Sequence, residues 1–264
     1  GGFSTLDASI GHFNSPTIEG ISTVFMILGS LPFVLYLQAV RGGFKALLKD
    51  TQVRWFLGIA FCATLALTGW LWANGDGNLG HSLRLASFNA ISVMTGTGYS
   101  SADFNLWGAF ALPLFTLIMF VGGCTGATTG GIKVFRIQVL YGTARMQLLK
   151  LIQPHGMFTM KFNGRPVPEE VPAAVMGFFF LFILGFGLVS LVLSLMGLDY
   201  VTSISGAATA ISNVGPGLGD IIGPHGNFQP LPDAAKWVLS FAMLIGRLEL
   251  FTILVLLVPH FWRD

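Results

Sequence analysis

Two glycine-bearing stretches place backbone carbonyl groups where they could bind a cation. TGTGYSS at 95–101 and SNVGPGLGD at 212–220 each follow a segment, 81–94 and 200–211, that is too short to span a bilayer. Glycine permits the positive φ angles that turn successive carbonyl oxygens toward one axis. Such oxygens replace the hydration shell of a cation, and the partly negative end of each short helix favours the same ion. The pattern therefore indicates a cation pore.

A third glycine-rich stretch, GGCTGATTGG at 122–131, interrupts an apolar segment that begins near residue 107. Five glycines in ten residues do not hold a helix. Backbone groups freed inside a membrane need water or polar partners. The stretch is therefore either a loop lining an aqueous cavity or a packing kink of small residues between helices.

Arg247 lies midway along the last apolar segment, where a charge costs at least about 2.5 kcal/mol. Glu249, two residues on, points to a different face of the helix and is a poor partner. The free carbonyls and threonine hydroxyls of residues 122–131 are suitable acceptors for the five donors of an arginine. We expect Arg247 to bind this loop; the alternative is a buried arginine that ties helices together.

The composition is that of an integral membrane protein. Of the 264 residues, 53% are hydrophobic and 10% charged, against about 25% charged in soluble domains. The links at 41–54 and 133–170 are rich in Lys and Arg, which places them in the cytoplasm, whereas those at 74–106 and 198–233 contain only Arg84. Five stretches have the length and apolarity of spans: 18–40, 55–73, 107–121 with its continuation, 172–197 and 234–258.

Asn163-Gly164, at the centre of MFTMKFNGRPV (157–167), predicts a type I′ hairpin in the second cytoplasmic link. This hairpin is either a docking surface or a plain connector. The two cysteines, Cys62 and Cys124, indicate neither a disulfide scaffold nor a zinc site.

The chain contains an internal repeat. A shift of 117 residues superposes Gly98 on Gly215, Ala90 on Ala207 and Ser92 on Thr209. Each copy reads as a spanning helix, a short helix, a glycine-bearing loop and a second spanning helix. The opening GGFST with the first apolar stretch matches the back half of a further copy, so we expect the chain to be part of a longer protein.

Four motifs make the chain resemble the second half of a TrkH-type subunit of the Trk/Ktr/HKT superfamily of potassium transporters, over essentially its whole length. The motifs are Gly2-Phe3-Ser4-Thr5, Thr97-Gly98-Tyr99-Ser100, Gly122 to Gly131 followed by Ile132-Lys133-Val134, and Asn213-Val214-Gly215-Pro216-Gly217. The resemblance implies an all-α membrane protein of four repeated helix–pore helix–filter loop–helix units, arranged like a potassium channel. In that arrangement 1–40 is the back half of repeat two, 41–54 a cytoplasmic link, 55–150 repeat three, 151–171 a cytoplasmic hairpin link and 172–264 repeat four.

The same resemblance assigns roles to residues of this chain. Gly2, Gly98 and Gly215 become filter glycines, and 122–131 becomes a gate loop below the filter, held closed by Arg247. The full filter set is Gly2, Phe3, Thr97, Gly98, Tyr99, Asn213, Val214, Gly215 and Pro216, with potassium bound at Thr97, Gly98, Val214 and Gly215. The gate set is Gly122, Gly123, Cys124, Thr125, Gly126, Ala127, Thr128, Thr129, Gly130, Gly131 and Arg247.

The implied function is passive or weakly coupled potassium uptake, in a multi-pass protein of the bacterial cytoplasmic membrane. Potassium is the substrate, no cofactor is expected and the chain is not an enzyme. The family implies a homodimer in membrane lipid with a cytoplasmic ring of TrkA-like nucleotide-binding subunits, docked on the basic surface 133–165. No nucleic-acid partner is expected.

Two other functions fit parts of the sequence. An ion-coupled secondary transporter also uses broken helices. GLGD at 217–220 matches the GxGD pattern of intramembrane aspartyl proteases, with Asp199 as the possible partner of Asp220. Both aspartates fall in an outer link and not within spans, which argues against the protease.

Overall fold

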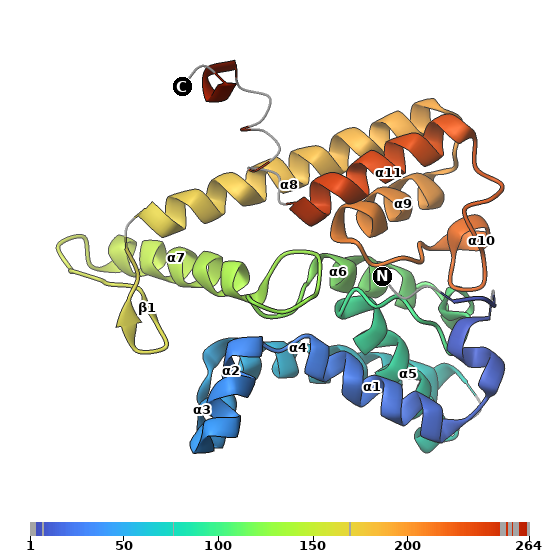
Figure 1. Ribbon diagram of the computed structural model, residues 1–264, viewed down its shortest axis with the longest axis horizontal. Helices are drawn as coiled ribbons and strands as arrows, with labels where there is room; N and C mark the ends of the chain where they lie inside the picture. Colours follow the sequence, from blue (N-terminus) through green and yellow to red (C-terminus); the bar gives the residue numbers. More distant parts are fainter. Residues whose placement is uncertain are drawn as a thin grey trace.

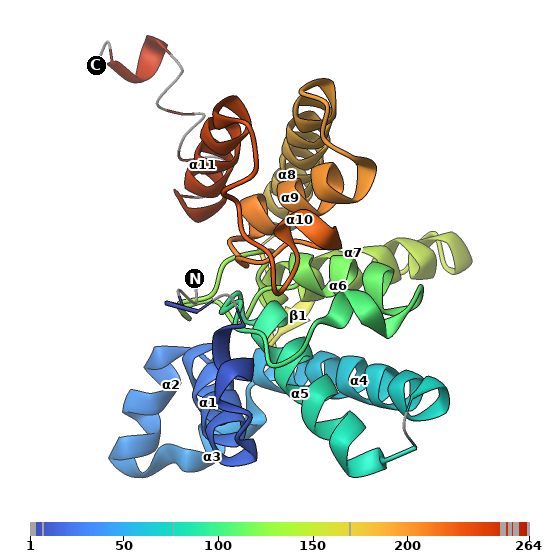
Figure 2. The same cartoon turned by 90° about the vertical axis from the view of Figure 1, so that its right-hand side faces the viewer.

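A computed structural model describes residues 4–6, 8–75, 77–168, 170–248, 252, 255 and 259–262. Helices α1 to α5 form one block, α8 to α11 form another, and α6 and α7 lie between them (Figures 1 and 2). The helices are α1 (Pro16–Gly29), α2 (Phe33–Gln38), α3 (Phe44–Lys49), α4 (Thr51–Asn74), α5 (Leu79–Met94), α6 (Ala111–Phe120), α7 (Val134–Ile152), α8 (Glu170–Leu195), α9 (Tyr200–Ser212), α10 (Gly219–Ile222) and α11 (Asp233–Leu248). Shorter turns are η1 (Ser9–Phe13), η2 (Ala39–Gly43), η3 (Phe104–Trp107) and η4 (Pro259–Trp262).

Two described helices, α4 and α8, are each long and apolar enough to cross a membrane. Asp50 begins α4 by accepting hydrogen bonds from the backbone N–H groups of Gln52 and Val53, at 2.8 and 3.3 Å. Such a cap stabilises a helix by about 1 kcal/mol. The side chain of Phe180 on α8 is 67% exposed, as a lipid-facing position requires. The expected third span is shorter, because the glycine-rich stretch ends α6 at Phe120.

The expected span at 18–40 is not one straight helix, although its two halves together are long and apolar enough to cross a membrane. Helices α1 and α2 meet at a 94° bend across a short break. Pro32 lacks an N–H group and disfavours helical geometry at the preceding residue, which ends α1. The break leaves the carbonyl oxygens of Gly29 and Ser30 free of helical partners, and both are used by the glycine-rich loop described below.

The predicted internal repeat is present as equivalent hydrogen bonds. In the first unit the Thr97 N–H donates to the Ser92 carbonyl at 3.0 Å, and in the second the Val214 N–H donates to the Thr209 carbonyl at 3.0 Å. These pairs are related by the same shift of 117 residues. The short helices α5 and α9 thus end in the same turn, and each packs against its own spanning helix, α4 or α8.

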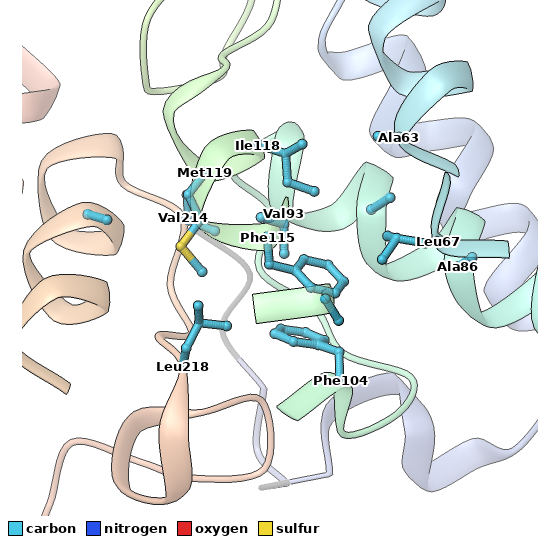
Figure 3. Packing of buried hydrophobic residues seen from close by; sticks show 13 residues of the cluster. Ala63, Leu67, Ala86, Val93, Phe104, Phe115, Ile118, Met119, Val214 and Leu218 are labelled. Atoms are coloured by element: carbon cyan, nitrogen blue, oxygen red, sulfur yellow. The ribbon is translucent and has the colours of Figure 1, made fainter. Parts of the chain in front are cut away.

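The core joins the two units. Figure 3 shows buried side chains of α4, α5, η3 and α6 packed together with Val214 and Leu218 of the second unit. Phe104 and Phe115 stack at its centre with ring centroids 4.2 Å apart. Burying one such side chain contributes about 1.5–3 kcal/mol. The loop after α9 is therefore held in place by the first unit as well as by its own.

The predicted hairpin is confirmed. Strands β1 (Lys161–Phe162) and β2 (Arg165–Pro166) pair antiparallel. The turn between them has φ 47° at Asn163 and 79° at Gly164, as a type I′ turn requires. The Asn163 side chain donates to Asp50 Oδ2 at 2.8 Å and accepts from the Thr51 N–H at 3.0 Å, so the turn is tied to the start of α4.

Candidate functional site: a carbonyl-lined filter above a glycine-rich loop

The loops that follow α5 and α9 lie side by side. A Cβ added at Gly98 would overlap the carbonyl oxygen of Val214, and one added at Gly215 would lie 3.7 Å from the Gly98 Cα. Gly98 has φ 77° and Gly215 has φ 123°, which side chains rarely adopt. Two segments 117 residues apart therefore meet at glycines in corresponding positions.

Four carbonyl oxygens at this meeting point remain available. Among the described residues, no hydrogen bond reaches the carbonyl oxygens of Thr97, Gly98, Val214 and Gly215. Val214 is buried, Thr97 and Gly98 are half-buried and Gly215 is exposed, so water or a cation can reach this group of free oxygens.

The Tyr99 carbonyl is different from these four. It accepts a hydrogen bond from Ser92 Oγ at 2.6 Å, which directs it toward α5. Tyr99 nevertheless lines a cavity next to the glycine-rich loop, together with Thr97. The expected filter residues Gly2 and Phe3 lie outside the described residues.

The segments beyond the filter glycines are tied to one another. The Gly11 N–H donates to the Ser100 carbonyl at 3.0 Å, and the Ser100 N–H donates to Ser9 Oγ at 3.4 Å. The Ser100 hydroxyl donates to the Pro224 carbonyl at 3.0 Å. Ser100 thus joins the segment before α1, the first filter loop and the segment after the second filter loop.

The two ends of the glycine-rich loop 122–131 are hydrogen-bonded together between α6 and α7, and we call this closed base the neck of the loop. The Gly122 N–H donates to the Ile132 carbonyl at 2.8 Å, and the Ile132 N–H donates to the Phe120 carbonyl at 2.9 Å. α6 ends before this neck and α7 begins after it. The loop is therefore a separate segment between α6 and α7, which favours a loop that lines a cavity over a packing kink of small residues between helices.

Polar contacts attach the loop to two other helices. The Cys124 N–H donates to the Ser30 carbonyl at 3.0 Å, and Thr128 Oγ1 donates to the Gly29 carbonyl at 3.1 Å. The Thr125 N–H donates to Gln52 Oε1 of α4 at 2.9 Å. The bend after α1 supplies two of these acceptors, since it leaves the last carbonyls of that helix unpaired.

The loop lies directly against the turns that end α5 and α9. A Cβ at Gly130 would overlap the Ser212 carbonyl oxygen, and one at Gly96 would lie 3.6 Å from the Gly130 N and 3.2 Å from the Asn213 carbonyl oxygen. A cavity of about 380 Å³ runs from Thr97 to Thr128 and Thr129 of the loop, with α1 as one wall. This volume holds several waters, since a water occupies about 30 Å³ of liquid.

The expected contact between Arg247 and the loop is present. Arg247 Nη1 donates a hydrogen bond of 2.8 Å to the Thr128 carbonyl oxygen. Gly246 allows this approach, because a side chain there would overlap the Ile211 carbonyl at the end of α9. Glu249, considered above as a partner, lies outside the described residues.

Lys133, which was expected on the cytoplasmic docking surface, contacts the glycine-rich loop instead. Its ammonium donates to Thr129 Oγ1 at 3.1 Å, to the Ala127 carbonyl at 3.4 Å and to the Thr129 carbonyl. Arg136, one turn on, stacks its guanidinium on the Phe178 ring at 3.7 Å. The signal in the sequence was a lysine two residues after the last glycine of the run, close enough for its side chain to reach back to the loop.

The two aspartates of the GxGD hypothesis have structural roles. Asp199 Oδ2 accepts from the Thr202 N–H at 3.1 Å and begins α9. The hydrogen bonds from Thr202 hold the Asp199 pKa below its usual value. Asp220 lies in the first turn of α10 and is exposed. Asp199 is therefore engaged as the cap of α9, which argues against its use in a pair of carboxyl groups that share a proton.

Comparison with known proteins gives a consistent result. The TrkH family model, described as a cation transport protein, matches residues 1–263. The chain is 48% identical to "Trk system potassium uptake protein TrkI" of Halomonas elongata and 35% identical to "Trk system potassium uptake protein TrkH" of Escherichia coli (strain K12). In both cases the match covers all of this chain and 54% of the relative, so the chain spans about half the length of these curated relatives.

The crystal structure of the potassium transporter TrkH from Vibrio parahaemolyticus matches with a TM-score of 0.92 at 36% identity, over 99% of this chain and 56% of that one. The match confirms the expected fold, an all-α membrane protein built from units with short pore helices.

Proposed function

Because the chain belongs to the TrkH family of cation transport proteins, we propose that it forms part of a gated pore for potassium uptake across the bacterial cytoplasmic membrane. The observation that carries the proposal is the meeting of two repeat-related loops whose free carbonyls cluster at Gly98 and Gly215. Two such loops supply part of a ring of oxygens. The opening segment and the remaining length found in the relatives would supply the rest.

In this proposal Thr97, Gly98, Val214 and Gly215 bind potassium through their carbonyl oxygens. Tyr99, Asn213 and Pro216 shape the filter. Asn213 does so with a left-handed backbone (φ 56°) and an amide that donates to the Met243 carbonyl at 3.1 Å. Gly2 and Phe3 would complete the contribution of the opening segment.

Loop 122–131 is proposed as the gate. It sits against both filter ends and borders the cavity below them, so it obstructs passage without selecting the ion. Arg247 and Lys133 hold it closed in two ways. Each donates to loop carbonyls, and their positive charges repel a cation that leaves the filter.

The proposed partners are a second copy of the protein and a cytoplasmic ring of nucleotide-binding subunits. Fewer basic residues belong to the docking surface than the sequence suggested, because Lys133 hydrogen-bonds to the loop and Arg136 stacks on Phe178. Exposed basic residues remain beside the hairpin and at the end of α7: Arg145, Lys150, Lys161 and Arg165. They suit a partner with an acidic face.

The function is tested with the full-length protein in liposomes. We expect potassium uptake down a potassium gradient, without any imposed proton or sodium gradient. Uptake that requires such a gradient would indicate the coupled transporter. Cleavage of a transmembrane peptide without potassium uptake would indicate the protease and overturn the proposal.

Replacement of Arg247 by alanine is expected to raise potassium flux about fivefold, because it removes one charge-assisted hydrogen bond worth about 1 kcal/mol at an exposed site. Flux, expression and monodispersity are measured together. Lys236→Ala is the matched control, since Lys236 lies on the same helix and pairs only locally with Asp233 at 3.1 Å. Normal folding with unchanged flux in Arg247→Ala would show that Arg247 does not hold the loop closed. Loss of folded protein would instead show that the arginine is needed for the structure.

A further inference from the structure

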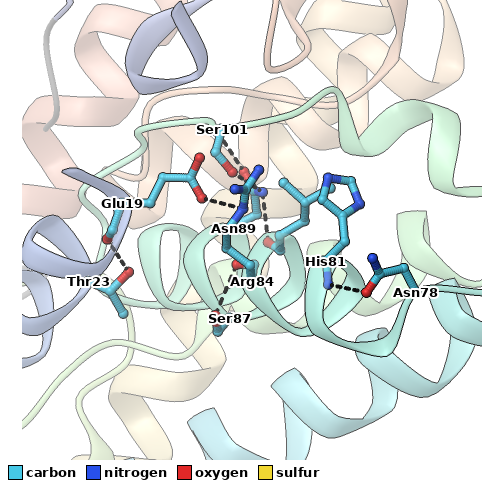
Figure 4. A network of polar contacts seen from close by, with 9 residues as sticks. Glu19, Thr23, Asn78, His81, Arg84, Ser87, Asn89 and Ser101 are labelled. Carbon is cyan, nitrogen blue, oxygen red and sulfur yellow. Dashed lines mark hydrogen bonds and ion pairs between the residues drawn. The ribbon is translucent and has the colours of Figure 1, made fainter. Parts of the chain in front are cut away.

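An ion pair joins α1 to pore helix α5 behind the first filter loop. Glu19 Oε2 lies 3.3 Å from Arg84 Nε, and the two side chains are 4% and 28% exposed (Figure 4). Glu19 stands near the start of an apolar helix, and Arg84 is the single Lys or Arg of the two outer links.

The same helix α5 is locked to the chain that follows the filter. Asn89, which is fully buried, donates from Nδ2 to Ser101 Oγ at 2.9 Å and accepts from the Ser101 N–H at 3.1 Å. The Ser92 hydroxyl holds the Tyr99 carbonyl at 2.6 Å. Any displacement of α5 is therefore transmitted to Tyr99–Ser101, directly beyond Gly98.

These contacts close into a ring. The Ser100 carbonyl accepts from the Gly11 N–H at 3.0 Å. Gly11 lies in η1, which leads into α1 and so back to Glu19. The circuit thus runs from Glu19 through Arg84, Asn89 and Ser101 to Gly11, and every link except the ion pair is made by short side chains or backbone.

We propose that the Glu19–Arg84 ion pair is a positioning pair that fixes α5 against α1 and thereby sets the potassium-to-sodium selectivity of the filter. The proposal rests on the proposed function. The backbone N–H groups of Thr97 and Gly98 both donate to the Ser92 carbonyl, at 3.0 and 3.2 Å, so the filter carbonyls follow α5. Selectivity depends on the size and field of the carbonyl cage, and both change when one of its walls moves.

Both members of the ion pair can be replaced by apolar residues of similar size. Such a variant tests the role of the pair in positioning α5 separately from any role in folding. Removing one partner of a buried ion pair strands the other charge and destabilises a protein strongly. Replacing both by apolar residues of similar size is often neutral for stability. Glu19→Leu with Arg84→Met therefore removes the ion pair while keeping apolar side chains between the helices.

The test measures potassium and sodium flux of the full-length protein in liposomes, with thermal stability and monodispersity. The variants are Glu19→Gln, the paired apolar variant and the charge swap Glu19→Arg with Arg84→Glu. We expect the first two to lower the potassium-to-sodium flux ratio by about threefold or more, and the swap to recover part of it. Asp233→Asn, which breaks an exposed pair on α11, should leave the ratio unchanged.

A folded paired apolar variant with the wild-type flux ratio would overturn the proposal. Failure of that variant to accumulate as folded protein would also overturn it, since the pair would then be a determinant of folding. Absence of potassium flux in the wild-type protein would instead contradict the proposed function, so the two failures are distinguishable.

Discussion

Excision of residues 123–130 is expected to raise potassium flux through the full-length protein by about tenfold or more, because a minor open state is typically populated at about 0.1–10%. The potassium-to-sodium ratio should stay unchanged, since the loop lies beyond the carbonyls that choose the ion. Fluxes of both ions in liposomes measure the effect.

The structure makes this excision feasible. Gly122 and Gly131 are already neighbours at the neck, where a Cβ on Gly131 would lie 3.3 Å from the Gly122 N. The hydrogen bonds on either side, between Gly122 and Ile132 and between Ile132 and Phe120, do not involve the excised residues. Joining Gly122 directly to Gly131 therefore keeps the neck between α6 and α7, although the Val134 N–H at the start of α7 loses its acceptor, the Gly123 carbonyl at 3.1 Å.

The excision lowers stability mainly by removing hydrogen-bond partners of buried polar groups that contact the loop. Gln52, which is 8% exposed, loses its acceptor role toward the Thr125 N–H. An orphaned buried polar group costs about 1–3 kcal/mol, unless water from the cavity replaces the partner. Thr128→Ala is a milder variant than the excision, because it removes only the hydrogen bond from the Thr128 hydroxyl to the Gly29 carbonyl. Its flux should rise less than that of the excision.

A folded excision variant with equal or lower flux would contradict the gate. A raised flux accompanied by loss of selectivity would place part of the filter within the loop itself.

Replacement of Gly98 by alanine is expected to abolish selective potassium flux. The backbone at Gly98 has φ 77°, which costs an alanine about 1–2 kcal/mol. The added methyl would also overlap the Val214 carbonyl oxygen and crowd the Pro216 ring at 2.8 Å. Both neighbours belong to the second filter loop, so relief requires movement of the filter itself.

Gly215→Ala should have a smaller effect. Its φ of 123° is unfavourable for alanine, but the nearest atom to the new methyl is the Gly98 Cα at 3.7 Å. Gly69→Ala is the control, because Gly69 lies within α4 with no atom near its Cβ position. It should preserve flux and selectivity, since alanine is the better helix former.

Potassium and sodium fluxes of the three variants, normalised to folded protein, provide the measurement. Wild-type selectivity in Gly98→Ala would show that Gly98 is not part of the filter. An effect of Gly215→Ala equal to that of Gly98→Ala would mean that backbone conformation alone, and not the close approach of the two loops, limits the site.

Local features of the sequence were sufficient for most elements and for their repetition, but not for the 94° bend between α1 and α2. The apolar segments, the glycines at 98 and 215 and the Asn163-Gly164 turn each constrain backbone conformation within a few residues. Their consequences could therefore be predicted without knowing what lies nearby. The contact between Arg247 and loop 122–131 was also predictable, because a charge within an apolar helix requires an acceptor and the loop offered unpaired ones.

The tertiary structure decided which groups meet. Pro32 was visible in the sequence, but the use of the freed Gly29 and Ser30 carbonyls depends on a loop more than 90 residues later. The location of Lys133 and the pairing of Glu19 with Arg84 likewise depend on how separate helices pack. A charged side chain reveals in the sequence that it needs a partner, but only the packing of the helices determines which partner comes within hydrogen-bonding distance.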